Sequence, residues 1–421
     1  MKNDINMAII GLGYVGLPLA IEFSQKYNVI GFDISQARIA ELQNGIDKTK
    51  EISQQEILQC RNMLFTSNVQ DIQDANIYII TVPTPTDSFN NPDLTPIKNA
   101  TKTIGSVLKK DDIVIYESTV YPGCTEEVCV PILESLSGLV YNRDFYCGYS
   151  PERINPGDKT MKLTDIKKIT SGSNESIAKI IDDLYSSIIA AGTYKASSIK
   201  VAEAAKIIEN TQRDVNIAFM NEISCVFQRI GIDTLEVIEA ASTKWNFLKF
   251  TPGLVGGHCI GVDPYYLIRK SELHDYSPKL LLSAREVNNK MSKEIVFNLV
   301  KKMIQRDIVI SRSSIAIFGI TFKENCSDIR NSKVVDIINE IKEYTNNIDI
   351  YDPHANISDV FYEYGLNLSS LSSFSSDKYQ AIIIAVAHDD FKDICFHCDK
   401  NMIIYDLKGM IKNKSENILR P

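Results

Sequence analysis

Residues 7–16 read MAIIGLGYVG, and the fold can be predicted from this stretch. The apolar run Met7–Ile10 predicts a short strand, and Gly11, Gly13 and Gly16 interrupt the chain before a helix-like segment. A strand, a glycine turn and a helix in this order are typical of the first unit of a doubly wound parallel sheet. We therefore predict an α/β fold.

The same glycines predict a binding site for a dinucleotide. The first permits a tight turn, the second lets a pyrophosphate approach the backbone, and the third lets the helix and the sheet pack closely. Asp33 ends the next strand, and its carboxylate would accept hydrogen bonds from ribose hydroxyls but repel a 2′-phosphate, which favours NAD over NADP. Arg38 either approaches the adenosine end or is a solvated helix arginine, and the sequence favours neither. The contacts expected from the motif are Gly11, Gly13, Tyr14, Val15, Gly16 and Asp33.

Length and composition exclude several classes of protein. A chain of 421 residues is too long for one ordinary core, so two or three domains are expected, and 44% hydrophobic with 23% charged residues is an ordinary soluble composition. A net charge of −8 argues against a nucleic acid or an anionic membrane as a partner. The nine scattered cysteines predict free thiols in a reducing compartment, and hence a cytoplasmic protein. We expect no metal site, because Cys395 and Cys398 have no second pair of ligands nearby.

Strand-like runs alternate with helical segments in the first third of the chain and again in the last quarter. The second set repeats the order of the first, with VIGFD echoed by DIYD and IYIITVP by AIIIAVAH. Between them, Ala202–Phe227 reads as one long helix, either a dimer surface or an internal spacer. We predict two Rossmann-like domains, 1–198 and 304–421, joined by a helical middle domain, 199–303. The strand-like runs are Met7–Ile10, Val29–Phe32, Ile77–Val82, Ile113–Tyr116, Ile315–Gly319, Asp349–Tyr351, Ala381–Val386 and Met402–Tyr405.

Two further loops leave the carboxyl ends of predicted strands, where ligands of open α/β sheets bind. They carry Thr84 within VPTP, 82–85, and Thr119 within ESTV, 117–120. Each hydroxyl is a candidate contact to the cofactor or to the reacting group. The alternative is a pair of ordinary turn threonines.

Residues 253–264, GLVGGHCIGVDP, carry the strongest indication of chemistry. Four glycines surround Cys259, and Asp263 follows four residues later, which a structural cysteine does not need. A thiolate near a cation is a strong nucleophile toward a carbonyl. A polar stripe at i, i+4 and i+7 on the predicted long helix either supplies that cation or is a solvated face. Its members are Lys206, Asn210 and Arg213.

Seven blocks together resemble the UDP-glucose/GDP-mannose dehydrogenase family along nearly the whole chain. They are GLGYVGLPLA, VPTPTD, ESTVYPG, SPERINPG, EAAKIIENTQRDVNIAFMNE, GLVGGHCIGVDPYYL and GITFKENCSDIRNS. SPERINPG and GGHCIGVDP are similar to the UDP-N-acetylhexosamine 6-dehydrogenases of surface-polysaccharide synthesis, whereas the UDP-glucose branch typically has SPEFLREG, with a glutamate where this chain has Pro156. The resemblance implies NAD-dependent oxidation of the C6 hydroxyl of a UDP-N-acetylhexosamine, with UDP-N-acetylglucosamine favoured over UDP-N-acetylgalactosamine.

The resemblance also implies roles for the residues that match the family's motifs. Cys259 would capture the C6 aldehyde as a thiohemiacetal, a second hydride transfer would give a thioester, and water would hydrolyse it, so that two NAD are used per sugar. Lys206 and Asn210 would stabilise an oxyanion or move protons. The residues implied to orient the water or the hydroxyl are Asp263, Thr119 and Glu152. Those implied to contact the UDP-sugar are Arg153, Ile154, Lys206, Asn210, Arg213, Gly256 and Lys323. Arg330 is implied to contact the cofactor, in addition to the candidates Arg38, Thr84 and Thr119 named above.

Several alternatives remain at this point. A homodimer through the central helix is expected from the family, with Lys244 as the candidate that reaches the partner's active site and Trp245 either at that interface or in ordinary packing. UDP-N-acetylmannosamine and UDP-glucose are alternative substrates. A two-electron hydroxy-acid dehydrogenase would need no nucleophilic cysteine, and a nucleotide sensor would need neither Cys259 nor Lys206.

Overall fold

The chain folds as two compact units. The computed structural model describes residues 5–60, 62–87, 90–154, 161–257, 260–394, 396, 402–412 and 415–421. Unit 1 comprises Met1–Glu209 with Tyr265–Tyr276, and unit 2 comprises Asn210–Pro264 with Ser277–Pro421. This division falls inside two helices, at 209/210 and at 264/265, and the three-domain division at 198/199 and 303/304 stays a prediction.

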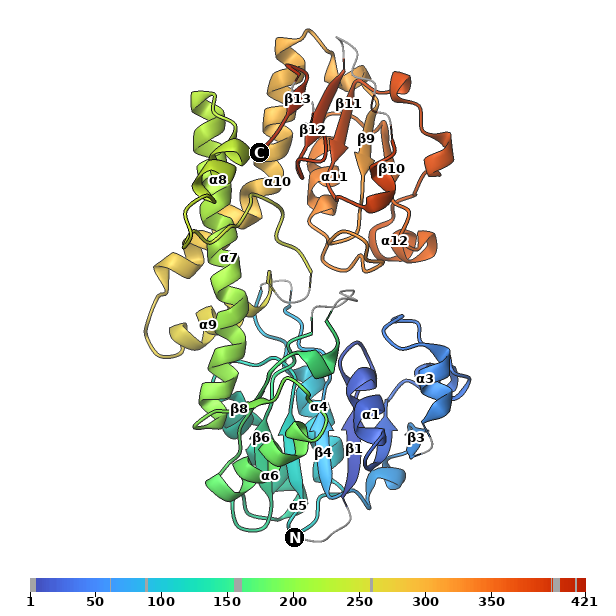
Figure 1. The fold of residues 1–421 in the computed structure, drawn as a ribbon, viewed down its shortest axis with the longest axis vertical. Coiled ribbons are helices and arrows are strands. Elements are labelled where there is room, and N and C mark those ends of the chain that lie inside the picture. Colours follow the sequence, from blue (N-terminus) through green and yellow to red (C-terminus); the bar gives the residue numbers. More distant parts are fainter. Residues whose placement is uncertain are drawn as a thin grey trace. The chain divides into compact units, whose positions relative to one another are not determined.

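Unit 1 contains a parallel sheet of six strands in the order β3-β2-β1-β4-β5-β6 (Figure 1). The strand order reverses between β1 and β4, which is the point where open α/β sheets bind their ligands. The predicted doubly wound parallel sheet is therefore confirmed. The strands are β1 Asn6–Ile10, β2 Asn28–Phe32, β3 Met63–Thr66, β4 Ile77–Ile80, β5 Ile113–Tyr116 and β6 Tyr146–Tyr149, and a separate pair is formed by β7 Lys168–Thr170 and β8 Thr193–Lys195.

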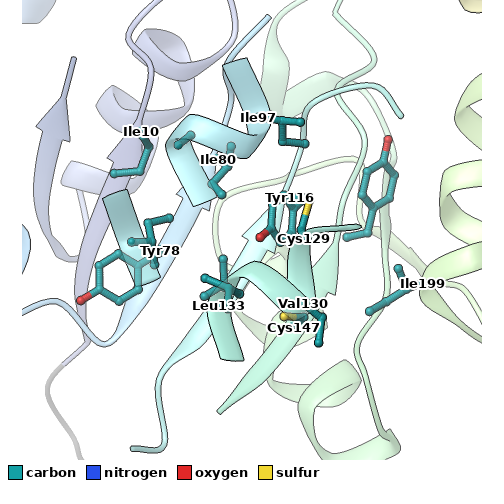
Figure 2. Close-up of a cluster of buried hydrophobic side chains, with 14 of the residues drawn as sticks. Ile10, Tyr78, Ile80, Ile97, Tyr116, Cys129, Val130, Leu133, Cys147 and Ile199 are labelled. Carbon is teal, nitrogen blue, oxygen red and sulfur yellow. The ribbon is translucent and has the colours of Figure 1, made fainter. Parts of the chain in front are cut away.

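Both faces of this sheet are buried, which explains why its strands are continuous apolar runs. Along β1, Met7 and Ile9 pack into one hydrophobic cluster, while Ala8 and Ile10 pack into another on the opposite face. Figure 2 shows the second cluster, in which Ile10 lies among side chains of neighbouring strands and helices. The covering helices are α1 Gly16–Ser24, α2 Gln36–Gln43, α3 Gln54–Gln59, α4 Thr95–Gly105, α5 Val130–Ser137 and α6 Glu175–Ser186.

Unit 2 contains a second parallel sheet, of five strands in the order β10-β9-β11-β12-β13 (Figure 1). The repeated order seen in the sequence corresponds to a shared topology of the two sheets. β1 pairs with β2 and β4, and β9 pairs with β10 and β11, so each first strand lies between the next two strand-like runs of the sequence. The strands are β9 Ile315–Phe318, β10 Ile348–Tyr351, β11 Ala381–Ile384, β12 Ile403–Asp406 and β13 Ile418–Leu419. The helices are α8 Thr234–Ala241, α10 Lys279–Gln305, α11 Val334–Lys342 and α12 Ile357–Tyr364, and α9 Asp263–Glu272 begins in this unit and continues in unit 1.

Helix α7, Ile199–Ile230, belongs to both units, as α9 does. It confirms the predicted long helix and extends it at both ends. The helix stops at Gly231, whose φ of +76° is a left-handed conformation that favours glycine. In the described part of the chain, no helix has the length and apolar character needed to cross a bilayer.

Candidate active site

The glycine turn after β1 is shaped by packing at two of its three glycines. Gly11 has a φ of +96°, and a Cβ there would lie 3.1 Å from the Val82 side chain. A Cβ on Gly16 would lie 1.8 Å from the Gly11 carbonyl oxygen and 2.4 Å from the Thr81 hydroxyl. The left-handed backbone of Gly11 and the close approach of a backbone oxygen to Gly16 therefore favour glycine at both positions.

The second glycine, Gly13, is different, because a Cβ there would have no heavy atom within 4 Å. The space is therefore open beside the backbone that precedes the N-terminus of α1, where a diphosphate is favoured by the helix dipole. Asp33 accepts the Leu12 N–H at 2.9 Å on one carboxylate oxygen and the Ser35 N–H at 2.9 Å on the other. Each oxygen keeps a lone pair for a ribose hydroxyl, so the residues present fit NAD.

Arg38 is not a solvated helix arginine, and that interpretation is wrong. Its Nε donates to the Leu12 carbonyl at 2.9 Å, and its guanidinium pairs with Asp47 at 2.8 Å, with only 12% of the side chain exposed. Burial by itself would raise the pKa of Asp47, but the hydrogen bonds from Arg38 and Thr49 outweigh it and lower that pKa. Arg38 thus stabilises the glycine turn through the Leu12 carbonyl, a contact that the sequence did not reveal.

The contrast between the glycines leads to a prediction. Gly16→Ala should destabilise unit 1 by about 2–3 kcal/mol, because its methyl group meets backbone, whereas Gly13→Ala should leave the unfolding midpoint unchanged. Gly13→Ala should instead weaken NAD binding at least tenfold, since its methyl group enters the space for the diphosphate. Urea unfolding and NAD titration by fluorescence would measure the two effects. Equal NAD affinity of wild type and Gly13→Ala would contradict this assignment.

A hydrogen bond joins the loops after β4 and β5, which parallel pairing places at the same edge of the sheet. The Ser118 hydroxyl donates to the Val82 carbonyl at 2.7 Å. The carbonyl of Thr84 accepts the Tyr266 hydroxyl at 3.0 Å, so this loop is also held by the unit 1 part of α9. Thr119, on the β5 loop, is half-buried. The two threonine loops therefore lie together at the carboxyl edge of the sheet.

Glu152, in the loop after β6, is buried and accepts hydrogen bonds on both carboxylate oxygens. It accepts the N–H groups of Arg153 and Ile154, both at 2.6 Å, and pairs with Lys168 at 2.9 Å. Arg153 pairs with Glu209 at 2.7 Å. Sequence reasoning missed Lys168, because a Lys-Lys pair in a polar stretch reads as a solvent-exposed surface.

The residues of the polar stripe on α7 differ in burial, and the stripe is not solvent-exposed along its whole length. Lys206 is 8% exposed and has no hydrogen-bond or ion-pair partner among the described residues, whereas Arg213 is exposed. The amide nitrogen of Asn210 lies 2.5 Å from a carboxylate oxygen of Asp263, the first residue of α9. The interpretation as a solvated face thus holds for Arg213 only.

Cys259, with His258, lies outside the described residues, but the segment before it is clamped at two points. The side-chain amide of Asn221, on α7, accepts the Gly253 N–H at 2.8 Å and donates to the Gly253 carbonyl at 3.0 Å. Asn331 accepts the Gly257 N–H on its carbonyl at 3.1 Å and donates from its side chain to the Gly257 carbonyl at 2.8 Å. These contacts fix the backbone that leads into the cysteine.

A close backbone contact within the protein explains why residue 256 is a glycine. A Cβ there would lie 2.6 Å from the carbonyl oxygen of Asn331, so only glycine permits this approach. The family resemblance had implied that Gly256 contacts a ligand instead. Contact of Gly256 with a UDP-sugar stays a prediction.

The loop after β9 carries Lys323 and Arg330. The Lys323 carbonyl accepts the Thr321 hydroxyl at 3.0 Å, and the Arg330 guanidinium forms two hydrogen bonds to Asp328, at 3.0 and 2.7 Å. The buried His388 accepts the Asn325 N–H at 3.0 Å and thereby ties the loop after β11 to this one. The sequence did not single out His388.

The two sheets also share a hydrogen bond at the turn that follows β1 in one and β9 in the other. Asp352, which follows β10, accepts the Ile320 N–H at 2.7 Å, just as Asp33 accepts the Leu12 N–H in unit 1. Burial would raise the pKa of Asp352, but His388 and the backbone amides lower it to about 2. The second sheet thus keeps the carboxylate that shapes the turn, although its turn lacks the glycine pattern.

Comparison with known proteins identifies the family. Sequence models of the UDP-glucose/GDP-mannose dehydrogenase family match its NAD binding domain at residues 5–189, its central domain at 200–290 and its UDP binding domain at 316–413. The chain belongs to this family. As a nucleotide-sugar dehydrogenase it uses NAD, in agreement with the glycine turn and Asp33.

Individual relatives of this dehydrogenase are similar over their whole length. It is 53% identical to the UDP-N-acetyl-D-glucosamine 6-dehydrogenase of Pseudomonas aeruginosa, with 98% of this chain and 99% of the relative covered. It is 52% identical to the enzyme of the same name from Salmonella typhi, with 99% of each covered. The structure of the UDP-D-ManNAc dehydrogenase of Pyrococcus horikoshii matches with a TM-score of 0.88 at 31% identity, covering 99% of this chain and 98% of that one.

Proposed function

We propose that this dehydrogenase oxidises the C6 hydroxyl of UDP-N-acetyl-D-glucosamine to a carboxylate. The observation that carries the proposal is the end-to-end identity, above one half, to two enzymes that bear that name. UDP-N-acetyl-D-galactosamine differs from this sugar by the orientation of one hydroxyl, and it is the second candidate substrate. The chemistry is RCH₂OH + 2 NAD⁺ + H₂O giving RCOO⁻ + 2 NADH + 3 H⁺.

We assign the covalent step to Cys259. Its sulfur adds to the C6 aldehyde, loss of hydride from the thiohemiacetal gives a thioester, and water releases the carboxylate and restores the thiol. Holding the aldehyde covalently prevents its escape between the two oxidations and keeps C6 oriented. The Asn221 and Asn331 clamps support the assignment, because they order the backbone next to Cys259.

The charged and polar groups are assigned by what each can supply. Lys206, buried and without a partner among the described residues, provides positive charge for a developing oxyanion. Asn210 and Asp263, already hydrogen-bonded to each other, position a proton or a water. NAD, when bound, accepts the hydride, and Gly11, Gly13, Gly16 and Asp33 would hold it. Glu152 and Thr119 are assigned to orienting the hydroxyl or the hydrolytic water, and Arg153, Ile154, Arg213, Gly256 and Lys323 to the UDP-sugar.

We also propose a homodimer through α7. The helix exposes Ile208, Phe219, Val226 and Ile230, and their spacing of 11, 7 and 4 residues places them on one face. A stripe of large exposed apolar side chains on one helix is typical of a helix–helix interface. Sedimentation of wild type and of Phe219→Asp would test this, with a monomeric variant as the expected result.

The proposed compartment is the cytoplasm. The cysteines that the structure describes, Cys60, Cys124, Cys129, Cys147, Cys225 and Cys326, are all free thiols.

In the described residues, no cluster of side chains could hold a metal ion.

The substrate and the electron count can be measured together. We expect UDP-N-acetylglucosamine to give the highest kcat/KM among UDP-GlcNAc, UDP-GalNAc, UDP-ManNAc and UDP-glucose, with two NADH formed per sugar consumed. Absorbance of NADH and quantitation of the uronic acid would give both values. One NADH per sugar would instead indicate a two-electron alcohol oxidation and would remove the thioester from the scheme.

A further inference from the structure

Unit 1 contains a buried ion triad next to the candidate catalytic loops. The Nζ of Lys168, on β7, lies 2.7 Å from a carboxylate oxygen of Glu117 and 2.9 Å from one of Glu152. The side chains of Lys168 and Glu117 are 2% and 0% exposed. The Tyr185 hydroxyl, from α6, donates to the other oxygen of Glu117. Such a group is costly to bury, so its retention calls for an explanation.

The lysine is held by a series of contacts between two antiparallel segments, 149–153 and 167–171. The Ser171 hydroxyl donates to the Tyr149 carbonyl at 2.7 Å, and the Ser150 hydroxyl donates to the Ile169 carbonyl at 2.7 Å. The Arg153 guanidinium donates to the Lys167 carbonyl at 2.9 Å. Lys168 therefore faces Glu152 because the register of the whole series places it there.

The two carboxylates belong to different loops. Glu117 follows β5 and lies two residues before Thr119, while Glu152 follows β6 and accepts the N–H groups of Arg153 and Ile154. One ammonium group thus connects both loops that carry candidates for orienting the reacting hydroxyl or water. A neutral residue at 168 would leave two buried carboxylates facing each other.

The two carboxyl groups of the triad differ in pKa. Burial, with repulsion from Glu152, raises the pKa of Glu117 to about 7 despite the attraction of Lys168. Burial would also raise the pKa of Glu152, but Lys168 and the two backbone amides more than offset it, so this pKa is lowered. Glu152 thus has two amide donors that Glu117 lacks, and as the pH falls Glu117 takes up the proton first. The ionisable groups facing Glu152 are Lys168, Glu117 and Tyr185.

We propose that Lys168 is a positioning residue of the active site, which keeps Glu152 a carboxylate and holds its loop against the loop of Thr119. The inference rests on the proposed function, which gives Glu152 its task. Lys168 touches neither sugar nor cofactor in this scheme. It acts through the charge and place of Glu152.

The test is the pH profile of kcat/KM for Lys168→Met. Removing an opposite charge at this distance raises a carboxyl pKa by about 1–3 units, so the acidic limb should move to higher pH by that amount. Lys168→Arg, which keeps the charge, should restore the wild-type limb. Lys179→Met, which breaks the exposed pair with Asp183 on α6, is the matched control and should leave the profile unchanged.

A second pair of variants covers the case in which Lys168→Met does not fold. Glu117→Gln removes one buried carboxylate, and Lys168→Met/Glu117→Gln then leaves Glu152 with its two amides. The acidic limb of the double variant should lie at higher pH than that of Glu117→Gln. A double variant with the same limb as Glu117→Gln, or a Lys168→Met variant that loses only stability, would show that the lysine is merely structural.

An infrared measurement separates this inference from the proposed function. At pH 7, Lys168→Met/Glu117→Gln should show a band of a protonated carboxyl group that is absent from Glu117→Gln and disappears when Glu152→Gln is added. This holds even if no UDP-sugar is oxidised, in which case the proposed function fails and the inference on charge stands. If wild type oxidises the sugar and the band is absent, Lys168 does not set the charge of Glu152.

Discussion

Replacing Cys259 by serine is expected to lower steady turnover to the uronic acid by a factor on the order of a thousand or more. A hydroxyl is a far weaker nucleophile than a thiolate at neutral pH, and the ester it would form hydrolyses more slowly than a thioester. The first oxidation does not need the sulfur. Rapid mixing should therefore still show NADH formation in the first turnover, followed by slow or no further release of product.

The matched control is Cys60→Ser. Cys60 is a half-buried thiol at the end of α3 in unit 1, packs against a hydrophobic cluster and donates to the Glu56 carbonyl at 3.2 Å. Its replacement should leave kcat and KM unchanged. Acid formation by Cys259→Ser at the wild-type rate would remove the cysteine from the mechanism and return the chain to the two-electron alternative.

Arg285→Met is expected to destabilise unit 2 by about 3–5 kcal/mol, because breaking one side of a buried ion pair leaves a charge without its partner. The Arg285 guanidinium lies 2.6 Å from the carboxylate of Asp214, with side chains 4% and 1% exposed. Asn288 donates to the same carboxylate at 2.7 Å and accepts from Asn221, which clamps Gly253. The loss should therefore also lower kcat, through the backbone that leads to the cysteine.

The pH dependence of this destabilisation has a defined sign. Burial raises the pKa of Asp214 even beside Arg285, and without the arginine that pKa rises further. A carboxyl group whose pKa is higher in the folded state than in the unfolded state loses stability as the pH rises from the unfolded value to the folded one. The difference between variant and wild type in the free energy of unfolding should thus be larger at pH 8 than at pH 5.

Two further variants check the cause of the Arg285 effect. Asp214→Asn in the Arg285→Met background should recover most of the loss, because no charge is then buried. Lys290→Met breaks the exposed pair with Glu286 on the same helix, α10, and should not move the urea midpoint. A single variant as stable as wild type at pH 8 would mean that the ion pair contributes nothing net.

The sequence predicted the features that depend on neighbours along the chain. β1, β4, β5, β9 and β11 begin within one residue of their predicted runs, because a strand buried on both faces must be apolar throughout. The predicted need for glycine agrees with the left-handed φ of Gly11 and with the clash that a methyl group would meet at Gly16. β3, β6, β7, β8 and β13 were missed, since each has four residues or fewer and sequences such as KIT are not apolar runs.

Local sequence was sufficient to specify the two parallel sheets, the long helix and the position of the nucleotide turn, because each follows from periodicity along the chain or from the conformational freedom of glycine. Which polar groups meet was settled by tertiary packing alone. Lys168 pairs with Glu117 across 51 positions, and Arg285 pairs with Asp214 across 71. A buried charge is stable only beside a partner, and that partner is chosen by how strands and helices pack, which no local pattern of residues records.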